Sequence, residues 1–208
     1  MYKIYINENE LILAESVTLK NKKSDIKNLL APYSGKTKML LSYIDMLEKT
    51  NRFDSITIHS KDFKQLKKDF NSLFKVVKAA GGLVRNEKNE ILFIFRRGFW
   101  DLPKGKMDQG EKKRETAERE VQEETGVENI VVGEKLITTR HVYKLSSGAR
   151  ALKKSFWFNM KAPKQKLVPQ TEEDITKAKW LTVTKVLNSD KPVFKNIKDV
   201  LDASKKAL

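Results

Sequence analysis

A single, strongly charged helix placed between strand-like segments constrains the fold of this chain most. Residues 112–125 are expected to form this helix, and Gly126 stands where a helix ends in the left-handed conformation. Glu120, Glu123 and Glu124 occupy positions i, i+3 and i+4, so their carboxylates share one helical face. Because like charges at this spacing repel and the apolar stripe is thin, a bound cation would stabilise the helix.

Strand-like segments flank the helix on both sides. They are expected at residues 76–85, 90–96, 135–143, 154–161 and 178–183. Residues 99–106 and 163–174 are expected to be loops, and a helix over residues 195–207 is expected to close the chain. This order of elements predicts a mixed fold of the α/β class, of the α+β type.

The first 75 residues are expected to form a small α+β accessory domain of their own. Residues 2–6 and 10–14 predict a hairpin, and residues 55–59 predict a strand. Apolar residues at helical spacing predict one helix after Gly35 and another from Phe63. The predicted domains are therefore 1–75 and 76–208, the second with a C-terminal helix.

Composition excludes several kinds of site. The chain has no cysteine and two histidines, which rules out disulfides, thiol catalysis and metal sites rich in Cys or His. No apolar stretch approaches the ~20 residues of a membrane helix, and residues 1–6 have the pattern of a strand rather than of a secretory signal. We therefore expect a cytoplasmic protein with no membrane partner.

The net charge of +15 is unevenly distributed. Residues 1–75 contain 14 basic and 9 acidic residues, residues 105–127 contain 5 and 7, and the rest of the chain contains 23 and 11. An acidic helix inside a basic domain is the layout expected for binding a polyphosphate through metal and side chains together. Nucleic acid is the less favoured alternative partner, and it predicts binding that weakens with salt.

The acidic face has the chemistry of a site for a hard cation. Oxygen ligands without Cys or His suit Mg²⁺ or Mn²⁺, ions that are usually shared between carboxylates and substrate phosphates. Arg119 precedes the three glutamates, and Glu111 is its expected ion-pair partner across the junction of loop and helix. A solvated acidic helix face is the alternative interpretation.

Residues 105–127 also match a longer pattern, Gly-x5-Glu-x7-Arg-Glu-U-x-Glu-Glu-x-Gly-U, where U is apolar. Its positions are filled by Gly105, Glu111, Arg119, Glu120, Val121, Glu123, Glu124, Gly126 and Val127. A chance match has a frequency of about one in 10⁸ per start position. The pattern is the box of the Nudix hydrolases, so the chain resembles this MutT-like family over roughly residues 76–190.

The resemblance implies the Nudix fold, a mixed β-sheet sandwiched between helices. It implies Mg²⁺-dependent, or Mn²⁺-dependent, hydrolysis of a nucleoside diphosphate linked to another moiety. It further implies Gly105, Glu120, Glu123 and Glu124 as metal ligands and Arg119 and Glu111 as residues that orient them. The base is a carboxylate of the box, with Glu120 and Glu123 as the candidates there, or a carboxylate of a distal loop. Nudix enzymes often add a loop carboxylate ahead of a late tryptophan strand. Glu173 and Asp174, ahead of Trp180, occupy that place, and a plain solvated loop is the alternative.

Features outside the box bear on the substrate. Residues 100–106 resemble the Trp-x-x-Pro-Lys-Gly segment of diadenosine polyphosphate and diphosphoinositol polyphosphate hydrolases. The residues predicted to bind substrate phosphates are Lys104, Lys106, Arg96 and Arg97. Tyr143 stands where dinucleoside polyphosphate hydrolases tend to carry a tyrosine that stacks on a base. Solvated basic residues and a packed tyrosine are the alternatives.

These features favour a dinucleoside polyphosphate as substrate. Diphosphoinositol polyphosphates, RNA 5′ ends and nucleoside triphosphates are alternatives for the same reaction. A non-catalytic nucleotide sensor with the same fold is the alternative from another class, and the complete box disfavours it. The role of residues 1–75 is open, and a homodimer is one arrangement that they would allow.

Overall fold

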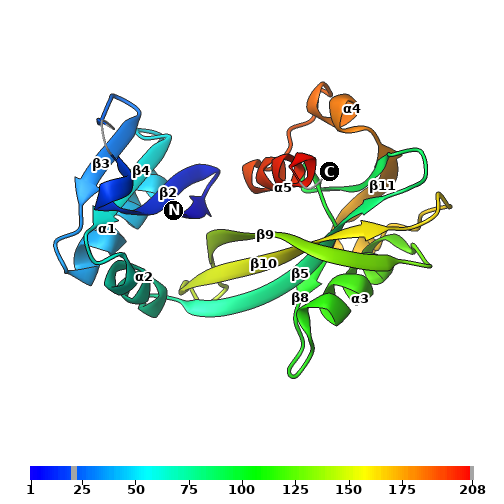
Figure 1. Ribbon diagram of the computed structural model, residues 1–208, viewed down its shortest axis with the longest axis horizontal. Helices are drawn as coiled ribbons and strands as arrows, with labels where there is room; N and C mark the ends of the chain where they lie inside the picture. The colour runs from blue at the N-terminus through cyan, green and yellow to red at the C-terminus, as the bar shows by residue number, and fades with distance from the viewer. Residues whose placement is uncertain (20–22, 207–208) are drawn as a thin grey trace. The chain divides into compact units, whose positions relative to one another are not determined.

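The computed structural model of the chain describes residues 1–19 and 23–206, which divide into two compact units (Figure 1). The first unit contains Met1–Val77 and Arg140–Lys153. The second contains Lys78–Thr139 and the chain from Lys154 onward. The compact units differ from the predicted division in two respects, because the first unit extends to Val77 and residues 140–153 join it. Domains of 1–75 and 76–208 stay a prediction.

The first unit is a mixed sheet with two helices. Its elements are β1 (Tyr2–Ile6), β2 (Asn9–Glu15), a 3₁₀ turn (Ser16–Leu19), β3 (Asn28–Pro32), α1 (Thr37–Lys49), β4 (Ser55–Ser60) and α2 (Phe63–Ser72). β1 and β2 pair antiparallel, whereas β2 and β3 each run parallel to β4. Leu40 of α1 and Phe70 of α2 share a buried core with Ile56 and Ile58 of β4. The predicted hairpin, strand and two helices are confirmed.

The sequence pattern did not predict β3. Its apolar run is only Leu29, Leu30 and Ala31, and it ends at Pro32, which favours a loop. The strand forms because it lies at the edge of the sheet, in the order β1-β2-β4-β3, where a proline removes no ladder hydrogen bond that the sheet needs.

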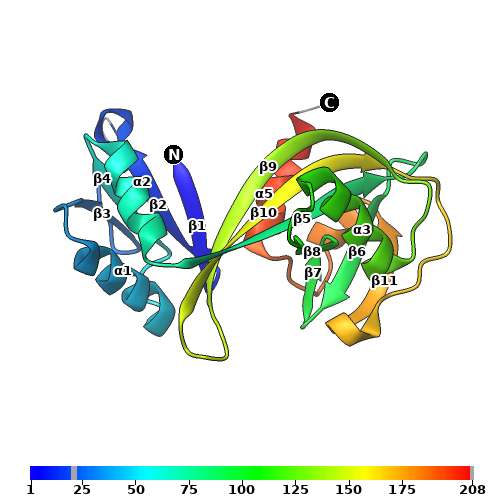
Figure 2. The same cartoon turned by 90° about the horizontal axis from the view of Figure 1, so that it is seen from below.

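The tip of a long hairpin completes the first unit. This hairpin consists of β9 (Val131–Lys144) and β10 (Arg150–Lys161), and β9 runs parallel to β1 at its far end (Figure 2). Val142 and Leu152 belong to the core of the first unit. Arg150 binds both Asp45 and Glu48 of α1. Residues 140–153 are therefore a structural part of the first unit, although they are distant from it in sequence.

The second unit is built on the strand order β11-β6-β5-β10-β9. Its further elements are β5 (Lys75–Arg85), β6 (Ile91–Arg96), β7 (Phe99–Asp101), β8 (Lys104–Lys106), α3 (Lys113–Thr125), a 3₁₀ turn (Thr171–Glu173), β11 (Ile175–Leu181), α4 (Val183–Leu187) and α5 (Lys195–Lys205). The prediction that residues 99–106 form a loop is wrong. β7 folds back on β6 and β8 pairs with β5, so each short strand forms against a long neighbour.

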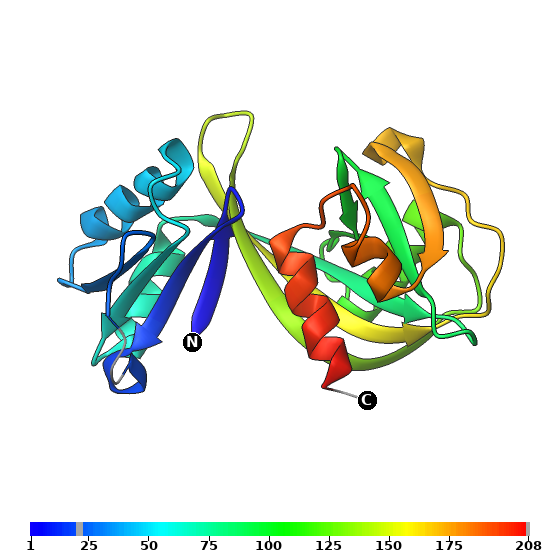
Figure 3. The ribbon, with the colours of Figure 1, turned by 90° about the horizontal axis from the view of Figure 1, so that it is seen from above.

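Two apolar cores lie on opposite faces of this sheet. One joins Trp157 and Phe93 with Val200 of α5. The other joins Phe158 and Leu92 with α3. Because side chains alternate along a strand, neighbouring residues serve opposite cores. Figure 3 shows α5 lying across the strands. The expected mixed sheet between helices is confirmed.

The C-terminal helices differ in how well the sequence predicted them. α5 agrees with the predicted helix as far as Lys205, and residue 207 of that prediction lies outside the described residues. α4, with five residues, was not predicted. Within residues 1–19 and 23–206, no helix has both the length and the apolar character that crossing a membrane requires.

Candidate active site

α3 carries the acidic face, and its ends are defined by local hydrogen bonds. The N–H of Lys112 donates to the Glu115 carboxylate at 3.2 Å. At the other end Gly126 adopts a φ of 67°, and its N–H donates to the Gln122 carbonyl at 2.7 Å. Ala117 and Val121 are buried against the sheet. The predicted helix and its stop are confirmed, and packing of the apolar face fixes the direction of the acidic one.

β8 lies against α3, and three consecutive residues of β8 each meet the helix. The Lys104 N–H donates to Glu124 Oε2 at 2.9 Å. Gly105 packs so closely against the Glu120 carboxylate that a Cβ atom would overlap it. The Lys106 carbonyl accepts a hydrogen bond from Arg119 Nη2 at 3.1 Å. In this register a side chain at position 105 would displace the Glu120 carboxylate.

Arg119 is the centre of the box. Its Nε and Nη2 donate to the two oxygens of Glu111 at 2.9 and 3.0 Å, so the expected ion pair between loop and helix is present. Its Nη1 donates to Glu120 and to Glu123, both at 2.9 Å. One guanidinium thus orients two carboxylates of the acidic face and ties the preceding loop to the helix.

The electrostatics of the box follow from these pairs. The hydrogen bonds from Arg119 lower the pKa of Glu111 to about 2. The same pairing raises the pKa of Arg119, with Glu111 as the largest cause. Asp108 is a further carboxylate 3.8 Å from Arg119. A single guanidinium therefore faces several carboxylates, and the box keeps an excess of negative charge.

Glu124 differs from the other two glutamates because it is buried, with 2% of its surface exposed. Burial raises its pKa to about 7, while the charge of Lys104 and its backbone hydrogen bond act in the opposite direction. Arg96 Nη1 lies 3.5 Å from Glu124 Oε1. A buried carboxylate with a raised pKa next to other carboxylates is typical of a functional site.

The side chains of the box fit a hard divalent cation by their donor chemistry. Nη1 of Arg119 lies 2.9 Å from an oxygen of Glu120 and 2.9 Å from an oxygen of Glu123, so these carboxylates already converge on a positive group. In the arrangement that the described residues adopt, no three His, Asp or Glu side chains are set as a metal site. Carboxylate oxygens are nevertheless the ligands that Mg²⁺ and Mn²⁺ prefer.

The ammonium of Lys104, predicted to hold substrate phosphates, is engaged by a carboxylate outside the box. It is buried and pairs with Asp101 Oδ2 at 2.5 Å, and Asp101 Oδ1 accepts the Leu102 N–H at 2.8 Å. The geometry therefore gives Lys104 a role in holding the turn between β7 and β8. Lys106 is exposed at the end of β8, which leaves it available for a phosphate. Asp101 was missed, although an acid three residues before a lysine is a pattern that could have indicated the pair.

The two neighbouring arginines at the end of β6 pair with the two loop carboxylates. Arg96 Nη2 lies 3.9 Å from Glu173 Oε2. Arg97 Nη2 donates to Asp174 Oδ2 at 2.9 Å. Of the four residues only Arg96 also touches the box, through Glu124. The sequence predicted all four as site residues but gave no sign of this pairing.

Tyr143 belongs to the first compact unit, whereas the box belongs to the second. Its ring lies 5.6 Å from the ring of His141. The stacking of Tyr143 on a substrate base stays a prediction.

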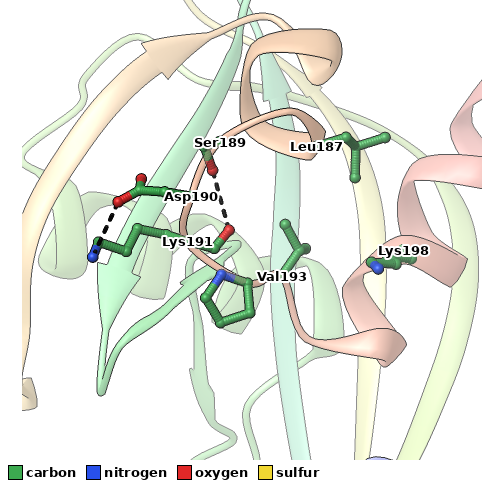
Figure 4. A pocket seen from close by; sticks show the side chains of 7 residues that line it. Leu187, Ser189, Asp190, Lys191, Val193 and Lys198 are labelled. Carbon is green, nitrogen blue, oxygen red and sulfur yellow. Dashed lines mark hydrogen bonds and ion pairs between the residues drawn. The ribbon is translucent and has the colours of Figure 1, made fainter.

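A hollow of about 270 Å³ in the second unit is separate from these residues. It is lined by Leu187, Ser189, Asp190, Lys191, Pro192, Val193 and Lys198 (Figure 4). On one side of the hollow Asp190 and Lys191 form an ion pair with each other, at 3.3 Å. None of the predicted site residues lines it.

Comparison with known proteins gives short and long matches. A Bacillus subtilis (strain 168) protein named "Putative 8-oxo-dGTP diphosphatase" is 48% identical over 46 residues, which are 21% of this chain and 31% of that protein. The chain therefore spans less than a third of the length of this curated relative. Such a short match carries no conclusion about the activity of the whole protein.

Solved structures match over a longer part of the chain. The Nudix hydrolase RenU from M. smegmatis has a TM-score of 0.50 and 18% identity, with 64% of this chain and 87% of RenU covered. The MutT protein from Methanosarcina mazei Go1 has a TM-score of 0.49 and 22% identity, with 64% and 96% covered. At such identities, the likeness to RenU shows the fold alone.

The family is shown by a profile of the NUDIX domain, which matches residues 75–203 and so covers more than half of the chain. Nudix hydrolases act on small nucleotide-linked substrates and generally use divalent metal ions such as Mg²⁺. The matched region contains the complete box and the sheet that carries it. This chain belongs to the Nudix family.

Proposed function

We propose that the chain is a Mg²⁺-dependent pyrophosphohydrolase that cleaves a phosphoanhydride bond in a nucleoside diphosphate linked to another moiety. The observation that carries this proposal is the contact of β8 with α3. It joins Gly105 to Glu120 and the Lys104 N–H to Glu124, while Arg119 orients Glu120 and Glu123. These contacts assemble the box from two elements that are separated in sequence.

We assign the metal-binding role to Glu120, Glu123 and Glu124, together with the Gly105 carbonyl. A bound Mg²⁺ or Mn²⁺ would neutralise the pyrophosphate and lower the pKa of a bound water. Arg119 holds two of the carboxylates in place through single hydrogen bonds of 2.9 Å each. Glu111 acts through Arg119, because it fixes the guanidinium from the opposite side.

Hydrolysis requires a carboxylate that takes a proton from water while the oxygen attacks phosphorus and the phosphoanhydride bond breaks. Within the box the candidates are Glu120 and Glu123. Both accept a hydrogen bond from Arg119 Nη1, which orients their carboxylates. The leaving phosphate carries away the electron pair of the broken P–O bond.

A dinucleoside polyphosphate is the favoured substrate. The motif at residues 100–106 and the basic excess around the box support it. Among the residues predicted to bind phosphates, Lys106 is exposed, whereas Lys104 and Arg96 are engaged by carboxylates. A nucleoside triphosphate is the second candidate, favoured by the segment shared with the B. subtilis protein. Diphosphoinositol polyphosphates and RNA 5′ ends are further candidate substrates to be tested.

A substrate panel resolved by chromatography of the products tests the proposal. With Mg²⁺ we expect diadenosine polyphosphates to be cleaved, and Glu120→Gln to lower kcat at least 10³-fold without unfolding the chain. Glu118→Gln, on the same helix but at a variable position of the box, is the matched control and should retain activity. If only nucleoside triphosphates are consumed, the proposed dinucleoside polyphosphate substrate is wrong. Binding without turnover of any substrate would instead indicate a nucleotide sensor.

Cytoplasmic location and a homodimer stay predictions. Cell fractionation tests the first, and light scattering tests the second.

A further inference from the structure

We propose that Arg96 is a positioning residue that holds Glu173 of the loop beside buried Glu124. Glu173, and not its neighbour Asp174, is then the loop carboxylate that acts together with the box. This inference rests on the proposed hydrolase function. It adds Arg96 as a positioning residue and Glu173 as the loop carboxylate of that reaction.

The position of Arg96 follows from the alternation of side chains along β6. Leu92 packs in the core that contains α3, and Arg96 stands four residues further along the same strand, on the same face. Its side chain is 15% exposed. Nη1 lies 3.5 Å from Glu124 Oε1, and Nη2 lies 3.9 Å from Glu173 Oε2. Two nitrogens of one guanidinium thus link the helix to the loop.

The backbone of the loop is tied to the same turn of α3. The Val168 N–H donates to the Thr125 carbonyl at 2.8 Å, and the Gln170 N–H donates to the Glu124 carbonyl at 3.1 Å. The Glu173 N–H donates in turn to the Gln170 carbonyl at 3.2 Å. Glu124 therefore meets the loop twice, through its main chain at Gln170 and through its side chain by way of Arg96.

The neighbouring pair has the same chemistry but a different position. Arg97 and Gly98 have φ values of 51° and 83°, and they form the two-residue turn between β6 and β7. Nε and Nη2 of Arg97 both donate to Asp174 Oδ2, at 3.1 and 2.9 Å. Both side chains are more than half exposed. Asp174 is thus held by an arginine with no described contact to the box.

The bridge depends on a guanidinium and not only on positive charge. Arg96 uses different nitrogens for its two partners, whereas a lysine has a single nitrogen on a shorter side chain. Arg96→Lys therefore keeps the charge and removes the bridge. A residue that only attracted substrate phosphates would tolerate lysine and would act mainly on KM.

Steady-state kinetics on the full chain with Mg²⁺ and the substrate found on the panel test this inference. We expect Glu173→Gln, Arg96→Gln and Arg96→Lys each to lower kcat roughly 10- to 100-fold with KM changed less than about threefold. Arg96→Gln combined with Glu173→Gln should be no slower than the slower single variant. Asp174→Asn should lower kcat less than about threefold, and exposed Glu172→Gln serves as the control for the loop.

Hydrogen–deuterium exchange without metal or substrate provides a readout that does not depend on turnover. Residues 168–175 should exchange faster in Arg96→Gln and in Arg96→Lys than in the wild type. Unchanged exchange in both variants would overturn the bridge made by Arg96, whether or not the wild type is active. Absence of cleavage of every substrate by the wild type would instead refute the proposed hydrolase function. Wild-type kcat in Arg96→Lys, an effect on KM alone, or equal losses in Asp174→Asn and Glu173→Gln would each overturn the assignment.

Discussion

Two arginines, one in each unit, lie among carboxylates in nearly the same way. Arg119 of the box and Arg150 of the hairpin tip each donate to the two oxygens of one glutamate. Arg150 also donates to one further acid, and Arg119 to two. Hydrogen bonds to Glu111 and to Glu48, respectively, raise the pKa of each guanidinium. The hydrogen bonds of the arginine therefore do not by themselves tell a candidate site from a structural ion-pair cluster.

They differ in the balance of charge. Around Arg150, the two acids have further cations, since Lys49 lies 3.2 Å from Asp45 and Lys144 lies 3.7 Å from Glu48. Around Arg119, four carboxylates lie within 3.8 Å of one guanidinium. The first cluster is neutralised and holds the hairpin tip on α1. The second keeps negative charge that a divalent cation can neutralise, so an excess of charge, rather than ion pairing itself, marks a candidate site.

Replacing each arginine by glutamine gives the largest expected contrast. Arg119→Gln should lower kcat about 10²- to 10³-fold, because Glu120 and Glu123 lose the group that orients them. Arg150→Gln should leave kcat within twofold and lower the free energy of unfolding by about 1–3 kcal/mol, because buried Glu48 loses its two hydrogen bonds from Arg150. Kinetics and urea unfolding of both variants measure this crossover. Equal effects on both quantities would contradict the distinction between the clusters.

Divalent metal ions should separate the clusters by their effect on thermal unfolding. A cation at about 100 times its Kd adds about 2.7 kcal/mol, which raises the Tm by roughly 5–10 °C for a chain of this size. Glu123→Gln should lose most of this rise in Tm. Glu48→Gln should show the full rise, starting from a lower Tm without metal. Scanning calorimetry with and without Mn²⁺ provides the measurement. A full rise in Glu123→Gln would place the metal outside the box.

The elements that sequence predicted correctly are those whose pattern is local. The glutamates of α3 and the stop at Gly126 depend only on helical spacing, and strands such as β5 and β6 carry long apolar runs. β3 and β8 are short and form only because a longer strand lies beside them. Their existence depends on tertiary pairing, which the pattern of one segment does not contain.

The site was predictable to the same extent. The box ligands follow from spacing, but the roles of Lys104 and Arg96 depend on which residues the fold brings beside them. Lys104 carries a charge, yet its side chain is buried and pairs with Asp101. Arg96 meets Glu124 and Glu173, which are 28 and 77 residues further along the chain. No local pattern encodes such partners.

Two glycines extend the comparison of the units to the backbone. Gly105→Ala should lower kcat about 10- to 100-fold, because the new methyl group displaces the Glu120 carboxylate from its position. Gly148, in the turn of the hairpin tip, has a φ of 80° and open space around its Cβ position. Gly148→Ala should therefore cost about 1 kcal/mol of stability through backbone strain and leave kcat unchanged. Full activity in Gly105→Ala would show that the close approach of β8 to α3 is dispensable.

The smallest expected difference lies in acid stability, where the clusters should behave alike. Arg119 lowers the pKa of Glu111 from 4.5 to about 2, and Arg150 lowers the pKa of Glu48. As the pH falls through 4.5 the unfolded carboxyls bind protons before the folded ones do, so protons favour the unfolded state. The stability from each pair is present above pH 4.5 and is lost as the pH falls below it, for Glu111 toward pH 2. Glu111→Gln and Glu48→Gln should each cost about 1–2 kcal/mol at pH 7 and flatten this acid slope. Urea unfolding from pH 7 to pH 3 measures both slopes. A slope unchanged in Glu111→Gln would mean that Arg119 holds this carboxylate without stabilising its ionised form.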